Sequence, residues 1–151
     1  MTKNSKGFTI IELLVVVAII AVLAAIVLVN VTGYINQGKN AAIKGNLATA
    51  LTNGAVYYDA NGNYYVDANV NLCTNAYITG PQAAIAAAYG ANVVQNCNAT
   101  ATTWCACSNL KTTSADIAGS TFCVDSTGYK KVTQNPDACA TRCPAAGACV
   151  D

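Results

Sequence analysis

The first apolar segment of the chain is the feature that most constrains its fold. From Ile10 to Val31 the sequence is apolar except for Glu12 and Asn30. About 20 apolar residues in a helix cross the hydrocarbon core of a bilayer, so this segment is long enough to span a membrane. A carboxylate inside such a segment is energetically expensive and indicates a functional role. The sequence therefore predicts an N-terminal helix that lies in lipid, among neighbouring copies, or in each in turn.

Two other kinds of segment share this apolarity. A secretory signal peptide has a shorter apolar region, roughly 7–15 residues, followed by small residues at the cleavage site. Ala21 to Ala25 could supply such a site, but the carboxylate of Glu12 near the start of the apolar region argues against it. An ordinary signal anchor would leave both Glu12 and the preceding Gly7-Phe8 pair unexplained.

The overall charge of the chain excludes several classes of function. The formal net charge is +1, and charged residues make up only 10% of the sequence. There is no basic stripe of the kind that binds nucleic acid. The chain has no histidine, no nucleophile elbow and no phosphate-binding loop, and no second carboxylate is close to Glu12 in the sequence. We therefore expect neither an enzyme nor a bound cofactor.

The eight cysteines all follow the apolar segment. Lys3 and Lys6 precede that segment, so the positive-inside rule places the N-terminus in the cytoplasm and the cysteines outside. An even number of cysteines in a small exported domain predicts disulfides, although their connectivity stays open. The cysteine spacings do not form a zinc site, so we expect no metal. The disulfide candidates are Cys73, Cys97, Cys105, Cys107, Cys123, Cys139, Cys143 and Cys149.

The start of the chain resembles the type IV pilin family. In both, a short basic leader ends in glycine, here Gly7, and is followed by Phe-Thr-x-Ile-Glu, here Phe8 to Glu12, and an apolar helix. The resemblance implies that a prepilin peptidase cleaves between Gly7 and Phe8 and N-methylates Phe8. It also implies that Glu12 meets the amine of Phe8 on a neighbouring subunit during filament assembly. The alternative is that Glu12 is simply an acid in the first helical turn, where the helix dipole favours it.

Two residues depart from the commoner pattern of that family. Ala21 stands where the family often has glycine, and Val29 stands where it often has proline. Both replacements remove points at which a helix is easily broken. We therefore expect a continuous helix as far as Asn30.

Beyond the apolar segment the helical pattern becomes amphipathic. Apolar residues recur at three- and four-residue intervals, which predicts one apolar stripe covered by a small head. The pattern stops at Asp59, where Asn61-Gly62 can end a helix or make a turn. The residues of the predicted stripe are Ile43, Leu47, Leu51, Ala55 and Tyr58, and Asn40 and Lys44 fall on other faces.

Short elements are predicted in the second half of the chain. Residues 83–89 favour a short helix ended by Gly90, residues 102–107 favour a strand, and residues 121–125 and 129–132 favour a hairpin. Side chains alternate across a strand, so Cys105, Cys107 and Cys123 would face away from an inward set of Trp104, Ala106, Phe122 and Val124. A bridge from Cys123 to Cys105 or Cys107 is then geometrically reasonable. The tail from residue 133 to 151 contains three cysteines, which we expect to pin it to the head.

These features predict an α+β pilin fold, in which a long N-terminal helix packs on a small antiparallel β-sheet in a disulfide-rich head. The predicted parts are a leader at residues 1–7, a transmembrane or filament-core helix at 8–32, and a head at 33–151 that includes a C-terminal cysteine-rich loop. The resemblance implies a single-pass membrane protein that polymerises with copies of itself into an extracellular, type IV pilus-like filament. Its partners would be the prepilin peptidase, the pilus assembly machinery and, before assembly, membrane lipid. The alternatives are a pseudopilin or minor pilin of a type II secretion or DNA-uptake system, and a membrane-anchored adhesin that does not polymerise.

Overall fold

The computed structural model describes residues 7–90, 93, 95–134 and 138–151. It contains two compact units, the N-terminal unit Met1–Ile35 and the head unit Asn36–Asp151. Helix α1 (Ile10–Asn61) runs through both, and it is uninterrupted through Asn30, as predicted. The other described elements belong to the head unit and are η1 (Leu72–Thr74), α2 (Ala76–Tyr89), β1 (Gln95–Ala99), β2 (Trp104–Asn109), β3 (Thr121–Asp125), β4 (Lys130–Thr133) and α3 (Cys139–Arg142).

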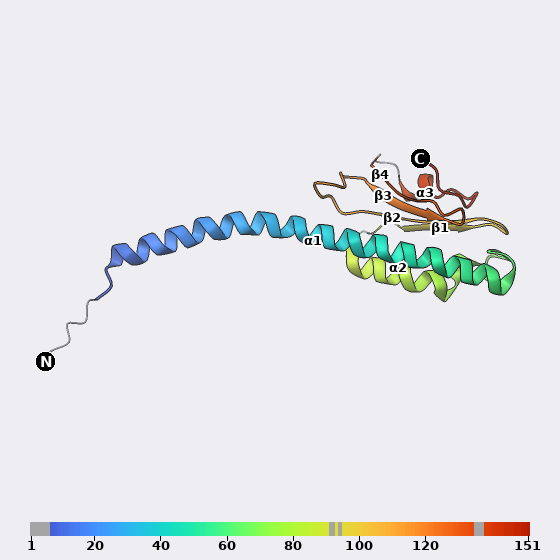
Figure 1. Cartoon of the computed structure of the whole chain (residues 1–151), viewed down its shortest axis with the longest axis horizontal. Coiled ribbons are helices and arrows are strands. Elements are labelled where there is room, and N and C mark those ends of the chain that lie inside the picture. The colour runs from blue at the N-terminus through green and yellow to red at the C-terminus, as the bar shows by residue number, and fades with distance from the viewer. Residues whose placement is uncertain (1–6, 91–92, 94, 135–137) are drawn as a thin grey trace. The chain divides into compact units, whose positions relative to one another are not determined.

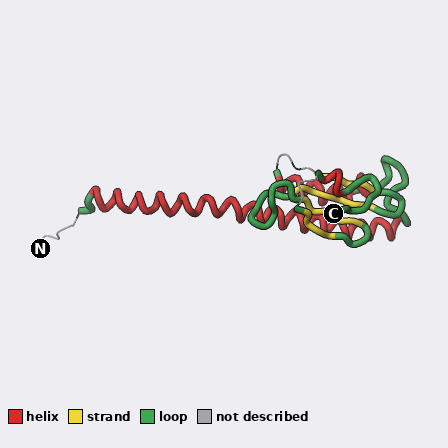
Figure 2. Tube along the Cα trace, turned by 90° about the horizontal axis from the view of Figure 1, so that it is seen from above, coloured by secondary structure: helices red, strands yellow, loops and turns green. Residues whose placement is uncertain are grey.

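The four strands form one antiparallel sheet in the order β1-β2-β3-β4. In the head unit, α2 and the sheet lie on opposite sides of α1 (Figure 1), and the strands overlie the helices when the molecule is turned (Figure 2). Helix α3 lies against the other face of the sheet, where it contacts β1, β2 and β3. The predicted α+β fold, a long N-terminal helix on a small antiparallel sheet, is confirmed.

The buried face of α1 follows a seven-residue repeat. Its buried positions are separated alternately by three and four residues, which keeps them on one side of the helix. Ile43 and Leu47 are buried, as predicted, but Ala55 and Tyr58 are exposed, so the predicted stripe is wrong in its second half. From Leu51 onward each predicted position is one residue later than the buried one, because the buried line continues through the small residues Ala50 and Gly54. The buried positions are Asn40, Ile43, Leu47, Ala50, Gly54 and Tyr57.

A tryptophan from the sheet explains why one of these positions is glycine. A Cβ atom added at Gly54 would lie 2.5 Å from the Trp104 ring. Trp104 is fully buried on β2 and also packs near Tyr64, with 6.4 Å between ring centroids. The missing side chain therefore lets α1 approach the central part of the sheet.

Helix α2 begins at Ala76, seven residues before the predicted start at residue 83, so Pro81 lies inside the helix. Asn75 caps its first turn by accepting a hydrogen bond from the Tyr77 N–H at 3.2 Å. A proline has no N–H to bond the carbonyl four residues earlier, which here belongs to Tyr77. Asn53 of α1 donates to that carbonyl at 2.8 Å, so the freed acceptor is satisfied and joins the two helices. The helix ends before Gly90, as predicted, and Gly90 has a φ of 89°.

The strands confirm part of the sequence prediction. The hairpin of β3 and β4 is present, and β2 begins at Trp104, two residues after the predicted start. Trp104, Ala106, Phe122 and Val124 all belong to the core against α1 and α2, as expected from alternation. Strand β1 was missed, because its sequence is mostly polar and all its residues are half-buried.

We expect Gly54→Ala to destabilise the head by about 1–3 kcal/mol, because the new methyl group meets a tryptophan ring that is already fully packed. Gly45→Ala is the matched control on the same helix, since nothing lies within 4 Å of its added Cβ. That change should be neutral or stabilise the protein by up to about 1 kcal/mol. Thermal unfolding of the detergent-solubilised chain measures both. Equal effects of the two substitutions would contradict the assigned contact.

Candidate functional site

The carboxylate of Glu12 is part of a capping box at the start of α1. The Thr9 N–H and hydroxyl donate to Glu12 Oε2 at 2.9 and 2.7 Å. In return, the Glu12 N–H donates to the Thr9 hydroxyl oxygen at 3.3 Å. A threonine followed three residues later by glutamate satisfies two N–H groups that a helix start leaves without partners. The acid therefore has a structural role at this end of the helix, although the cap does not neutralise its charge.

The side chains around this carboxylate are exposed and apolar. Phe8 is 76% exposed and Ile10 is 83% exposed. Helix α1 is long and apolar enough to cross a membrane, and none of its most apolar window is buried inside the protein. The N-terminal unit thus offers an apolar surface with one carboxylate, which can pack in lipid or against similar helices and can attract a cation. The exposed apolar side chains include Leu13, Leu14, Val15, Val16, Val17, Ile19, Ile20, Val22, Leu23, Ile26, Val27 and Leu28.

Disulfides hold the tail against the face of the sheet opposite the core. Cys105 and Cys107 of β2 and Cys123 of β3 project from this outer face and form a buried cluster with two tail cysteines. Each of the three is bonded to the tail, and the Cα atoms of the four pairs are 5.4 to 6.1 Å apart. The bonds are Cys73–Cys97, Cys105–Cys143, Cys107–Cys139 and Cys123–Cys149.

The interpretation that Cys123 bridges Cys105 or Cys107 is wrong. Cys107 and Cys123 are direct partners in the register of β2 and β3, but each bonds to a residue of the tail instead. A bond to the tail closes a longer loop than a cross-strand bond, and in the chain-entropy description it restricts the unfolded chain more. It also covers an outer face that a cross-strand bridge would leave open. Among the described residues, no group of three or more metal-ligating side chains is placed to hold a metal ion.

The matches to known proteins each cover part of the chain. Residues 2–28 match the prokaryotic N-terminal methylation motif, a stretch that contains Gly7, Phe8 and Glu12. The type IV major alpha-pilin of Moraxella bovis is 47% identical over 47 residues, which are 31% of this chain and 30% of that protein. The type IV wide pilus major component of Thermus thermophilus is 41% identical over 56 residues, which are 37% of this chain and 39% of that protein.

The methylation motif and these relatives show that part of the chain is similar to type IV pilins. The match spans well under half the length of these relatives, 30% of one and 39% of the other. No solved structure matches the chain significantly. The likeness to type IV pilins therefore rests on 31 to 37% of the chain and on the motif at residues 2–28.

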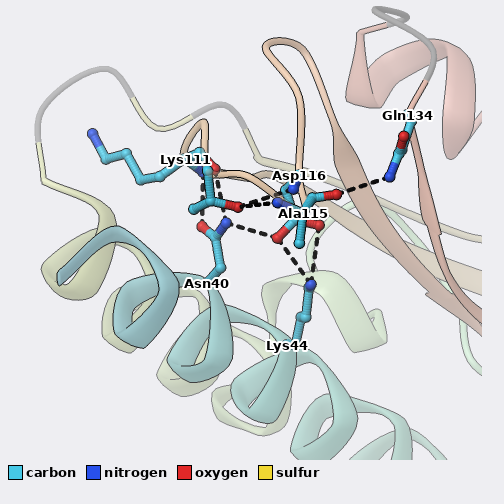
Figure 3. Close-up of polar contacts among 7 residues, drawn as sticks. Asn40, Lys44, Lys111, Ala115, Asp116 and Gln134 are labelled. Carbon is cyan, nitrogen blue, oxygen red and sulfur yellow. Dashed lines mark hydrogen bonds and ion pairs between the residues drawn. The ribbon is translucent and has the colours of Figure 1, made fainter. Parts of the chain in front are cut away.

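A polar cluster fastens the loop between β2 and β3 to α1 (Figure 3). Asn40 accepts from the Lys111 N–H at 2.8 Å and donates to the Lys111 carbonyl at 2.7 Å and to Asp116 at 2.9 Å. The ammonium of Lys44 lies 3.1 Å from the buried Asp116 carboxylate. The buried asparagine is thus fully occupied, and it fixes where this loop meets the helix. Gln134 supports the same loop through the Ala115 carbonyl at 2.9 Å.

The buried carboxylate of Asp125 joins the β3–β4 turn to the tail. Its Oδ1 atom accepts from the Thr127 N–H at 2.8 Å, the Thr127 hydroxyl at 2.6 Å and the Tyr129 N–H at 3.2 Å. Its Oδ2 atom accepts from the Cys149 N–H at 2.8 Å. Because both oxygens are used, this one side chain shapes the turn and anchors the tail beside the Cys123–Cys149 bond.

Two more groups show how the tail is attached. The Tyr129 hydroxyl donates to the Asp151 carboxylate, and this bond, together with Lys131 nearby, lowers the pKa of Asp151. Burial, followed by the same hydrogen bond, raises the pKa of Tyr129. Asp151 therefore contributes stability above its unfolded-state pKa and loses it as the pH falls through its folded-state pKa. Tyr129 contributes stability below its unfolded-state pKa and loses it as the pH rises through its folded-state pKa.

Sequence reasoning missed three of these features. The spacing Thr9-x-x-Glu12 before an apolar run is a capping-box signal that the sequence does carry. Asn40 was placed away from the core, because a polar residue gives no apolar signal even when its hydrogen bonds are satisfied. Asp125 is followed by Ser-Thr-Gly, which indicates a turn but not the bond to Cys149.

We expect Asp125→Asn to destabilise the head by about 1–3 kcal/mol, because an amide nitrogen would face a backbone N–H and leave a buried donor without an acceptor. Asp67→Asn is the matched control. The exposed Asp67 carboxylate also shapes a turn, but it accepts the Asn69 and Val70 N–H groups on one oxygen alone, which an asparagine can replace. Chemical denaturation of the unassembled, oxidised protein measures both. A loss for Asp67→Asn as large as for Asp125→Asn would refute this assignment.

Proposed function

We propose that this chain is a type IV pilin, the structural subunit of a type IV pilus-like extracellular filament. Its residues 1–7 are a leader that prepilin peptidase removes at Gly7-Phe8, and Phe8 is then N-methylated. Residues 8–32 cross the membrane and afterwards form the filament core, and residues 33–151 form the head. The names of the relatives support this role, since two of them are described as the major pilin or the major component of a pilus.

The observation that carries the proposal is the Glu12 carboxylate within an exposed apolar helix. Its hydrogen bonds with Thr9 satisfy lone pairs and N–H groups but supply no positive charge. A charge buried among apolar side chains needs a partner of opposite charge. Cleavage after Gly7 creates such a partner, because it leaves an amine on Phe8. The amine of a neighbouring subunit would pair with Glu12 as that subunit enters the filament.

This pairing gives a reason for the helix to leave the membrane. Lipid chains and a bundle of apolar helices are similarly apolar, so the hydrophobic effect does not favour one environment over the other. Packing between helices and the pairing of Glu12 must therefore favour the filament. The exposed apolar surface from Ile10 to Leu28 is the part of the chain that would be covered in both environments.

The N-terminal mass and sequence of material sheared from intact cells test the processing step. We expect a chain that starts at N-methyl-Phe8 and pellets with filaments. A chain that is found only in membranes and still carries Met1–Gly7 would contradict the proposal. The head would then be that of an anchored adhesin that does not polymerise.

Substitutions at the helix start separate the charge of Glu12 from its capping role. Glu12→Gln removes the charge but preserves a capping box, since glutamine also serves at this position. Thr9→Ala removes the cap and keeps the charge, at a cost of about 1 kcal/mol in helix stability. We expect Glu12→Gln to abolish pelletable filaments and Thr9→Ala to preserve them, with equal amounts of pilin in the membrane. The reverse pattern would show that Glu12 acts through capping alone.

A further inference from the structure

The head unit carries its charges in an uneven pattern along α1. Between Lys44 and Lys111 the charged residues are Asp59 and Asp67, and both are acidic. Lys39 lies near the start of the head part of α1, and Asp59 lies near its end. At 1.5 Å per residue these two positions are about 30 Å apart along the helix. The head part of α1, with the loops beside it, therefore has a basic end and an acidic end.

The basic end is formed by Lys39 and Lys111. Lys111 is held beside the start of the head helix, because its backbone makes two hydrogen bonds with Asn40. Its ammonium lies 3.9 Å from the centre of the Tyr89 ring, a contact that leaves the charge in place. Lys44 is also at this end, but Asp116 is 3.1 Å away and cancels its charge. The same loop exposes an apolar side chain, Ile117.

The acidic end is formed by Asp59 and Asp67. Asp59 is exposed in the last turn of α1, where the helix dipole favours cations and disfavours an acid. Asp67 lies in the loop that follows, which folds back so that the Leu72 N–H bonds the Tyr64 carbonyl at 2.8 Å. The same loop exposes Val66 and Val70. The acidic end thus combines two negative charges with two exposed apolar side chains, and the basic end combines two positive charges with one.

Among the residues that the structure describes, neither Asp59 nor Asp67 has a cation beside it in its own chain. The ion pairs Lys44–Asp116 and Lys131–Asp151 include neither Asp59 nor Asp67. An acid at the C-terminal end of a helix weakens the fold slightly, so the fold alone does not explain Asp59. A cation from another molecule would explain it.

We propose that the acidic end of one head (Asp59, Asp67, Val66, Val70) docks on the basic end of another copy (Lys39, Lys111, Ile117). This contact rests on the proposed filament, in which copies of the chain are brought together in one orientation by their N-terminal helices. The occupant is a second copy because the two ends are complementary: one carries two negative charges, the other carries two positive charges, and both expose apolar surface. The contact joins different surfaces on the two copies, so it extends a chain of subunits and does not close a dimer. Its charges select the correct orientation, because like ends repel.

Charge reversal at each end tests the contact in cells that assemble the filament. The acidic-end variant carries Asp59→Lys and Asp67→Lys, and the basic-end variant carries Lys39→Glu and Lys111→Glu. We expect each variant to lower the yield of pelletable filaments about tenfold or more, because like charges then meet across the contact. The variant with all four reversals restores opposite charges and should recover most of the yield. Recovery by the combined variant excludes misfolding as the cause of either loss.

Lys130→Glu is the control for net charge, since this exposed lysine lies on the edge strand β4 and not in the proposed contact. It should leave the filament yield unchanged. The contact is overturned if the unmodified chain forms filaments and the reversals do not lower their yield. It is also overturned if the combined variant is not rescued, or if Lys130→Glu is equally harmful. If the unmodified chain gives no filaments at all, the proposed function fails and the contact falls with it.

Discussion

Trp104 of β2 packs directly on the backbone of α1 at Gly54, and the arrangement of the head depends on this contact. Side chains alternate across a strand, so fixing Trp104 toward the helix turns Cys105 and Cys107 to the opposite face. These two cysteines then bind the tail through Cys143 and Cys139. One strand therefore presents its apolar residues to the helices and its cystines to the tail. The core and the covering of the outer face are consequences of the same register.

The two parts of α1 differ in how their apolar residues are covered. In the head unit a narrow buried line, spaced by three and four residues, is covered by α2 and the sheet. In the N-terminal unit the apolar residues lie on all sides, and nothing in the described chain covers them. A helix that is apolar on all sides needs a membrane or other helices around it. The head can thus fold within one chain, whereas the N-terminal unit needs other molecules.

The sequence predicted the features that depend on strong local patterns. The long helix, the hairpin of β3 and β4, the inward set that includes Trp104 and the stop at Gly90 follow from apolarity, alternation and a turn residue. The second half of the stripe on α1 was missed because Ala50 and Gly54 are buried for their small size, which the apolar pattern does not register. The start of α2 was missed because Pro81 indicates a boundary, whereas Asn53 of another helix satisfies the carbonyl that it frees. The disulfide connectivity depends on how the tail crosses the sheet, and no local pattern contains that path.

The cap at the start of α1 supplies hydrogen bonds to Glu12 but no positive charge, and this difference explains why the proposed assembly needs a cation. Glu12 lies within the first turn, so in a membrane it is near the edge of the hydrocarbon, where water and the Thr9 cap can serve its oxygens. In the proposed filament the same carboxylate would be surrounded by neighbouring apolar helices, and water would no longer reach it. The hydrogen bonds from Thr9 cannot balance a charge in such surroundings, because a buried ion needs a partner of opposite charge as well as hydrogen bonds. The cap is sufficient to stabilise the Glu12 carboxylate while the subunit is in the membrane. An amine from the next subunit becomes necessary only when neighbouring helices of the filament bury Glu12.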